Sequence, residues 1–346
     1  MTHEIFGERF FGHREPAWHK LGVVSSEPMS GIEALTAIGG GFWFDKRPVY
    51  VNLEGELKET ESFALVRSAL PDDPQERVMD YVTKQYNILQ PLEAIEIFDR
   101  AVKQPVETLG MLGKGERMFV TWKLPSFEVT PGDEVKPYGF VALGFDALMG
   151  ASLNVVTTRV VCANTWKIAI GESERKSKNG NQNLGHIWSG KHTSKNMARD
   201  LEIWMEHVQG KAEAQSNSAA NIFQAMANVP ITELKVVSSL LYNIYPDPKS
   251  LPLDFPEKLR LEKQSVIDQQ KEQAENDRDM VINLFDDAGT AIDATAWGLF
   301  NAVTEMENWG RTTRKPPENS ILFGGRNQSM NRAARIISEY AYLNEQ

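Results

Sequence analysis

The pattern of apolar residues changes character near residue 200, and this change limits the folds open to the chain. Before it, short apolar runs are separated by glycine-rich and charged turns, which is the pattern of β-strands joined by hairpins. After it, apolar residues recur at helical spacing over longer segments. Strands do not alternate with helices, so a doubly wound nucleotide-binding fold is disfavoured. We predict an α+β chain with a mostly antiparallel, β-rich N-terminal core and a few helices, followed by a helical C-terminal half.

Three segments follow from this pattern. Residues 1–30 contain no regular period, and we expect them to form an irregular N-terminal arm. Residues 31–200 are expected to form the β-rich α+β core. Residues 201–346 are expected to be helical, with a long charged helix near residues 257–285.

The clearest predicted element is a hairpin over residues 106–124. Two strand-like runs flank the turn Gly113-Lys114-Gly115-Glu116, which has the composition and length of a hairpin loop. In the second run, apolar residues at even positions alternate with Arg117, Phe119, Thr121 and Lys123. We expect the even positions to face the core and the odd positions to form a basic face with one aromatic ring.

Charge is distributed unevenly along the chain. The 346 residues carry 37 Lys+Arg against 47 Asp+Glu, which argues against indiscriminate coating of duplex DNA. Between Ala151 and Arg199, however, eight basic residues against two acidic ones give a net charge of plus six. The basic residues are Arg159, Lys167, Arg175, Lys176, Lys178, Lys191, Lys195 and Arg199, and the acidic ones are Glu172 and Glu174. We call residues 151–199 the basic stretch.

The first half of the basic stretch predicts an anion site. A strand over residues 154–162 leads to Asn164, a good N-cap for a short helix whose free N–H groups would attract a negative charge. Arg159, Asn164 and Lys167 would then lie near a phosphate, and Trp166 would stack on a base. An ordinary capped helix with a surface arginine is the alternative interpretation.

The second half of the basic stretch predicts another helix start. Lys191, His192, Lys195 and Arg199 surround it, and basic side chains at this end of a helix oppose its dipole unless an anion binds there. A solvated helix face is the alternative.

Several classes of site have no sequence support. The single cysteine, Cys162, excludes an intramolecular disulfide and a cysteine-based zinc cluster. The chain lacks both G-x-x-x-x-G-K-[ST] and G-x-S-x-G, so kinase and hydrolase chemistry are unsupported. The pair Asp72-Asp73 is interpreted as solvated charge in a turn. We therefore assign no catalytic residue, metal ligand or cofactor.

Membrane segments are also not expected. No apolar run approaches the roughly 18 to 20 residues that span a bilayer, and the charged N-terminus lacks an apolar signal core. These features favour a cytoplasmic protein without membrane partners.

Four blocks carry a resemblance to a known family. They are EPAWHKLG (residues 15–22), TTRVVCANTW (157–166), KHTSKNMAR (191–199) and TAWGLFNAVTE (295–305). Together they resemble an uncharacterised family of phage and plasmid proteins found in actinobacteriophages and plasmids. The resemblance implies a bacteriophage or mobile-element protein in the host cell cytoplasm, and it carries no catalytic residue over. Trp166 departs from the family pattern, in which a small aliphatic residue is expected.

In outline the predicted fold is also similar to single-strand annealing proteins of the RecT/Redβ/Erf type. This more distant resemblance implies single-stranded DNA as a partner and a homo-oligomer. The first hypothesis is therefore a single-stranded-DNA-binding protein, acting in annealing or recombination without bond cleavage. Its binding groove would be lined by Arg117, Phe119, Lys123, Arg159, Asn164, Trp166, Lys167, Lys191, His192, Lys195 and Arg199.

Three other functions stay open. The main alternative is a non-enzymatic protein-interaction or host-takeover factor with a host or phage protein partner. An enzyme with an unrecognised site and a virion component are the others. The DNA hypothesis requires the basic segments to converge on one groove of the folded chain.

Overall fold

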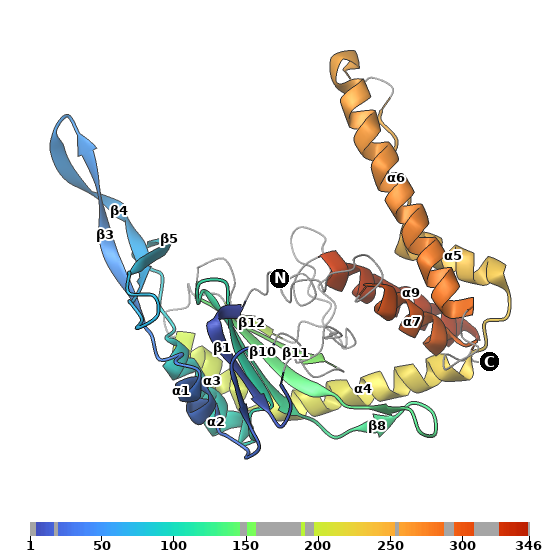
Figure 1. Ribbon diagram of the computed structural model, residues 1–346, viewed down its shortest axis with the longest axis horizontal. Coiled ribbons are helices and arrows are strands. Elements are labelled where there is room, and N and C mark those ends of the chain that lie inside the picture. The colour runs from blue at the N-terminus through green and yellow to red at the C-terminus, as the bar shows by residue number, and fades with distance from the viewer. Residues whose placement is uncertain are drawn as a thin grey trace. The chain divides into compact units, whose positions relative to one another are not determined.

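The computed structural model describes residues 5–16, 20–145, 151–156, 188–190, 197–252, 256–286, 294–307 and 325–344. The fold is α+β, with antiparallel sheets in the N-terminal part and most helices in the C-terminal half, so the predicted fold class is confirmed (Figure 1). The chain forms two compact units. The sheet unit comprises Thr2–Ser126 and Val135–Ser218, and the helical unit comprises Phe127–Glu134 and Ala219–Gln346.

A seven-stranded sheet forms the centre of the sheet unit. Its strand order is β12-β11-β10-β7-β6-β1-β2, and only the β1–β2 pair is parallel. The strands are β1 (Ile5–His13), β2 (Val23–Ser25), β6 (Thr108–Leu112), β7 (Arg117–Lys123), β10 (Tyr138–Gly144), β11 (Ala151–Val156) and β12 (Trp188–Gly190).

The expectation of an irregular arm over residues 1–30 is wrong for β1 and β2. Strand β1 lies inside the sheet, between β6 and β2, and its residues Phe10 and Phe11 are buried. Burial of two phenylalanine rings favours pairing of this segment, although Gly7 and Glu8 adopt positive φ angles of 52° and 36° that interrupt the strand pattern.

Three helices of the sheet unit pack next to one another: α1 (Gly31–Ala37), α2 (Pro91–Val102) and α3 (Met197–Met205). Ser30 and Glu33 form a capping box at the start of α1. The Asp99 carboxylate of α2 accepts hydrogen bonds from the backbone N–H groups of Gly31 (2.6 Å) and Ile32 (2.9 Å). One carboxylate therefore both caps α1 and joins it to α2.

A second sheet contains β3 (Phe44–Leu53), β4 (Glu56–Arg67) and β5 (Arg77–Thr83). The turn between β3 and β4 consists of Glu54 and Gly55, both with positive φ. Strand β5 pairs with β4 only between Ser62 and Arg67. Between Ser62 and the turn, the β3–β4 hairpin therefore has two strands. The hairpin consequently extends past β5 as a two-stranded ribbon (Figure 1). The short strands β8 (Phe127–Glu128) and β9 (Glu134–Val135) also pair.

The C-terminal helices are α4 (Val208–Asn228), α5 (Leu234–Ile244), α6 (Glu257–Asp286), α7 (Ala296–Glu305) and α9 (Gly325–Asn344). Aromatic rings fill the core of the helical unit. The Phe223 ring of α4 lies 4.6 Å from the Trp297 ring and 5.9 Å from the Phe300 ring, both on α7. The Trp297 indole N–H donates to the Asp133 carboxylate at 2.8 Å, so the polar edge of this ring is also satisfied.

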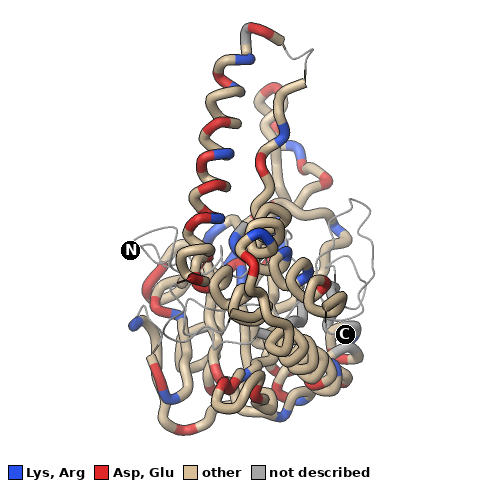
Figure 2. The backbone as a smooth tube through the Cα atoms, turned by 90° about the vertical axis from the view of Figure 1, so that its right-hand side faces the viewer, with Lys and Arg blue, Asp and Glu red and all other residues tan. Residues whose placement is uncertain are grey.

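Helix α6 matches the long charged helix predicted near residues 257–285. Its C-terminal part is buried at Asp277, Arg278 and Val281, and the Arg278 guanidinium donates to the Tyr245 carbonyl oxygen at 2.6 Å. Acidic and basic residues are interspersed along the rest of the helix (Figure 2). Among the described helices, none combines the length and apolarity needed to cross a membrane.

Candidate functional site

The basic stretch begins in β11 and returns to the seven-stranded sheet in its outer strand, β12. Strand β11 starts the stretch, and β12 returns the chain to the same edge, where Leu153 pairs with Trp188 and Ala151 pairs with Gly190. The 31 residues between Val156 and Trp188 (188 − 156 − 1 = 31) therefore leave from and return to two adjacent strands. This topology places the residues on either side of that segment, Val156 and Trp188, on neighbouring strands.

Lys123 lies close to the point where β11 ends. Tyr138 of β10 pairs with Lys123 of β7 on one side and with Val156 of β11 on the other. Lys123 and Val156 therefore lie on either side of Tyr138 in the sheet. The Lys123 side chain is 51% exposed, and its Nζ lies 3.9 Å from a carboxylate oxygen of Glu107. The exposed Lys123 side chain therefore lies near the C-terminal end of β11, and Arg159 follows that end by three residues in the sequence.

Arg117 lies at the other end of β7, an inner strand of the sheet. It starts β7, pairs with Gly144 of β10, and its side chain is half-buried. Lys123 follows it by six positions along the strand, which corresponds to roughly 20 Å. Gly190, where the chain continues toward Lys191, pairs with Ala151 at this same end of β11. Arg117 and Lys123 therefore lie at the two ends of an inner strand and do not meet at one point.

The prediction that the Phe119 ring faces a nucleic acid is wrong. Phe119 is 1% exposed and stacks on Phe140 at 5.9 Å, with Phe10 on its other side at 6.3 Å. Thr121, on the same face of β7, is also fully buried. The alternation of apolar and basic residues along β7 predicts one buried face and one solvent-exposed face. In the structure both faces of this inner strand are buried over residues 118–122.

The remaining candidates divide between described and undescribed positions. Arg199 lies in α3 and is exposed. The other predicted contacts lie outside the described residues: Arg159, Asn164, Trp166, Lys167, Lys191, His192 and Lys195.

A buried histidine–glutamate pair next to Lys123 was not predicted. His13 at the end of β1 and Glu107 before β6 are 5% and 4% exposed, and His13 Nδ1 lies 3.4 Å from Glu107 Oε2. Within the described part of the chain, His13 Nε2 has no hydrogen-bond partner. The two residues lie 94 positions apart, so local spacing gives no signal for this contact. Glu107 meets His13 on one side and Lys123 on the other.

Metal binding finds no support at this pair. Across the residues that the structure describes, no group of three or more His, Cys, Asp or Glu side chains is arranged to hold a metal ion. A histidine and one carboxylate supply fewer ligands than the three or four that a protein zinc site uses.

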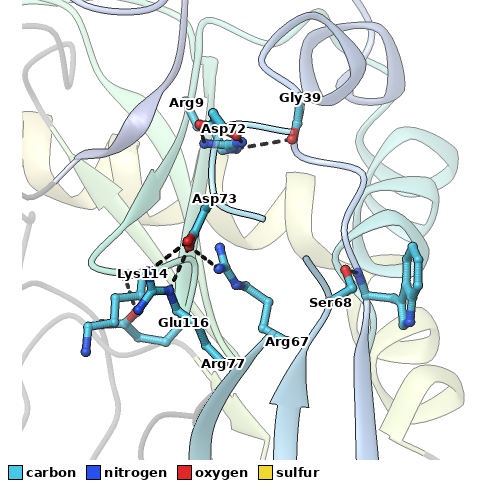
Figure 3. Close-up of polar contacts among 10 residues, drawn as sticks. Arg9, Gly39, Arg67, Ser68, Asp72, Asp73, Arg77, Lys114 and Glu116 are labelled. Carbon is cyan, nitrogen blue, oxygen red and sulfur yellow. Dashed lines mark hydrogen bonds and ion pairs between the residues drawn. The ribbon is translucent and has the colours of Figure 1, made fainter. Parts of the chain in front are cut away.

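The second charged cluster joins β1 to the three-stranded sheet (Figure 3). The Arg9 guanidinium donates to both oxygens of the Asp72 carboxylate, at 2.8 Å for Nη1, and its Nε donates to the Gly39 carbonyl oxygen at 3.2 Å. The bidentate contact with Arg9 lowers the pKa of Asp72 below its usual value. Asp72 lies in a turn with its side chain 55% exposed, as expected, and it is also the ion-pair partner of the buried Arg9.

Arg67 is the most deeply buried charge of this cluster. It is 0% exposed, donates to the Asp73 carboxylate, and its guanidinium carbon lies 4.6 Å from the centre of the Phe6 ring. Asp73 also accepts two hydrogen bonds from Arg77, each 2.7 Å long. The donors of Arg77 and then of Arg67 hold the pKa of Asp73 well below its ordinary range. Because Arg67 is inaccessible to solvent, we interpret this cluster as structural.

Comparison with known proteins gives one result. A family model described as a domain of unknown function (DUF932) matches residues 78–334. No curated protein and no solved structure gives a significant match.

Proposed function

The chain belongs to the DUF932 family of unknown function, and we propose that it binds single-stranded DNA along the outer edge of its seven-stranded sheet, without cleaving the strand. The observation that supports this proposal is the meeting of β11 and β12 at that edge, since they bring both ends of the segment between Val156 and Trp188 together. A chain with a net charge of −10 gains a local site for phosphates only where basic residues are gathered in this way.

The proposed contacts follow the edge from one end to the other. Lys123 and the residues after Val156 (Arg159, Asn164 and Lys167) would contact phosphates at one end. Arg117, Arg199 and the residues after Gly190 (Lys191, His192 and Lys195) would contact them at the other. Since Phe119 is buried, base stacking in this proposal depends on Trp166.

We further propose that the protein acts as an annealing or recombination factor of a bacteriophage or other mobile element, in the cytoplasm of the host, as a homo-oligomer. The four sequence blocks between residues 15 and 305 support this assignment. No bond cleavage is part of the proposal, because its contacts are cations, an amide and a stacking ring.

A titration of labelled single-stranded oligonucleotide, followed by fluorescence anisotropy, tests the proposal. We expect binding at about 50 mM salt, with an affinity that falls steeply as salt rises, because bound phosphates release counterions. The oligonucleotide should be recovered at full length on a denaturing gel. Absence of binding at low salt, or an affinity that does not depend on salt, contradicts the proposal.

A protein-interaction function is the second candidate, and one observation favours it. Apolar side chains are exposed on the three-stranded sheet at Tyr50, Leu57, Val78 and Tyr81, and at Trp43 just before β3. Exposed apolar groups gathered on one element are typical of a protein contact surface. Pull-down from host lysate after nuclease treatment would retain a partner if this function holds, and would lose it if nucleic acid bridges the two proteins.

A further inference from the structure

The distal part of the β3–β4 hairpin carries large apolar side chains that are open to solvent. We call residues 50–61 the hairpin arm, which extends past β5 and consists of two strands (Figure 1). Where β5 adds a third strand, Leu65 is 0% exposed, whereas in the arm Tyr50 is 50% exposed and Leu57 is 73% exposed. A two-stranded ribbon is only marginally stable alone, so these side chains gain little by packing within the arm.

One face of the arm combines both of these side chains with a carboxylate. Residues that lie directly opposite each other in a ladder share a face. Tyr50 pairs with Glu59, and Asn52 pairs with Leu57, on this face, which we call the Tyr50–Leu57 face. The Tyr50 hydroxyl donates to the Glu59 carboxylate at 3.4 Å. Because its partner in the described part of the chain is this neutral hydroxyl, Glu59 keeps an uncompensated negative charge.

The opposite face of the arm compensates its own charge. Val51 pairs with Lys58, and Leu53 pairs with Glu56, on that face. Lys58 Nζ lies 3.9 Å from a carboxylate oxygen of Glu56, and both side chains are exposed. The two charges cancel, so the Tyr50–Leu57 face is the face that presents net negative charge beside its apolar groups.

The charge of the whole arm limits what can cover this face. Four glutamates against one lysine give four minus one, a net charge of minus three. These five exposed residues are Glu54, Glu56, Glu59, Glu61 and Lys58. Nucleic acid, an anionic lipid surface and the arm of a second copy would each be repelled by like charge. A basic protein surface is attracted, and its Lys or Arg side chains can also stack on the Tyr50 ring.

We propose that the Tyr50–Leu57 face is a docking site for a basic segment of another protein, in which Lys or Arg residues flank an apolar contact. Tyr50 and Leu57 form the apolar centre of the site, and Glu59 binds a cation of the partner. The site lies within β3 and β4 and does not rest on the proposed DNA binding. It gives the second candidate function, protein interaction, a defined surface and a class of partner.

Selection from a displayed library of random peptides, carried out on the full chain, tests the proposal. Acidic, neutral and basic peptides compete in such a library, so the selection itself reports which chemistry the arm binds. The face variant carries Tyr50→Ser and Leu57→Ser. The matched control variant carries Val51→Ser and Leu53→Ser, which remove two exposed apolar side chains from the opposite face of the same arm. Circular dichroism checks that both variants fold like the wild type.

We expect the wild type and the control variant to select peptides in which Lys or Arg lies next to apolar residues, and the face variant to lose them. A selected peptide should bind the face variant at least about tenfold more weakly than the wild type, because its two apolar contacts are gone. Added salt should weaken its binding to the wild type. The proposal is overturned by arm-dependent peptides that are neutral or acidic, by a selection without arm-dependent peptides, or by equal loss in both variants.

Two further measurements distinguish the other occupants. We expect the wild type and the face variant to have the same oligomeric state in sedimentation velocity. Self-association that the face variant alone loses would make a second copy the occupant and overturn the proposal. Both proteins should bind single-stranded oligonucleotide equally, and weaker binding by the face variant would assign the face to DNA instead. If the wild type binds no oligonucleotide but selects basic peptides through the arm, the functional proposal alone fails.

Discussion

At the scale of single residues, buried charge is organised around Asp73. This carboxylate is the hydrogen-bond acceptor of Arg67, which is 0% exposed, and it is shared with Arg77. Removing the partner of a buried charge leaves that charge uncompensated, which costs more than the pair contributes. The stability of the sheet unit should therefore depend on Asp73 far more than on exposed ion pairs.

Replacing Asp73 with Asn tests this dependence. We expect the variant to unfold at a clearly lower denaturant concentration, because Arg67 loses its charged acceptor. The matched change Glu76→Gln removes a pair with Arg47 in which both side chains are about half exposed, and it should have a much smaller effect. Equal effects of the two substitutions in urea denaturation would show that the Arg67 contact does not stabilise the fold.

Acid should act through the same carboxylate. The pKa of Asp73 is lowered in the folded chain, so between its folded and unfolded pKa values the unfolded state binds more protons. Its contribution to stability is complete above about pH 5 and is lost as pH falls through the folded pKa. Urea midpoints measured from about pH 6 downward should fall less steeply for Asp73→Asn than for the wild type. Parallel curves would contradict this assignment.

Lys123 gives a residue-scale test of the proposed DNA contact. Its side chain is 51% exposed but lies 3.9 Å from the buried Glu107 carboxylate, so Lys123→Ala should lower stability, and circular dichroism checks that the variant is folded before binding is compared. The variant should bind single-stranded DNA more weakly, and the slope of log affinity against log salt should become shallower by about 0.7. Lys58→Ala, which removes an exposed lysine of β4, should bind like the wild type. Unchanged binding by Lys123→Ala would remove this residue from the site.

At the scale of secondary-structure elements, large side chains pack closely against the backbone of the inner strands of the seven-stranded sheet. A Cβ added to Gly139 of β10 would lie 2.1 Å from Cζ2 of Trp122, which is fully buried. Gly139→Ala should therefore lower the free energy of unfolding by about 1 to 3 kcal/mol, since the ring has no room to move. Gly41→Ala, where no atom lies within 4 Å of the new Cβ, serves as the control. Comparable denaturation curves for both variants would contradict tight packing at Gly139.

Local patterns predicted some elements well. The hairpin of β6 and β7 was expected because a glycine-rich turn marks its position, and the charged helix α6 was expected from its composition. Strand β1 was missed, since Gly7 and Glu8 break its alternation and its partner β6 lies about 100 residues later. The contacts of Asp72 with Arg9 and of His13 with Glu107 likewise join residues 63 and 94 positions apart, which a single sequence does not encode locally.

At the scale of the whole molecule, an acidic chain carries one basic stretch whose ends meet at a sheet edge. Sequence located this stretch by its charge, and the structure supplied the adjacency of β11 and β12.

Hydrogen exchange of the full chain, with and without a single-stranded oligonucleotide, tests the central claim most directly. The account predicts slower exchange of backbone amides within residues 151–199, including β11 and β12, when DNA is present. Hydrogen exchange in residues 50–61, at the tip of the β3–β4 hairpin, should not slow. Slower exchange confined to regions outside the basic stretch, or no change at saturating oligonucleotide, would contradict the account.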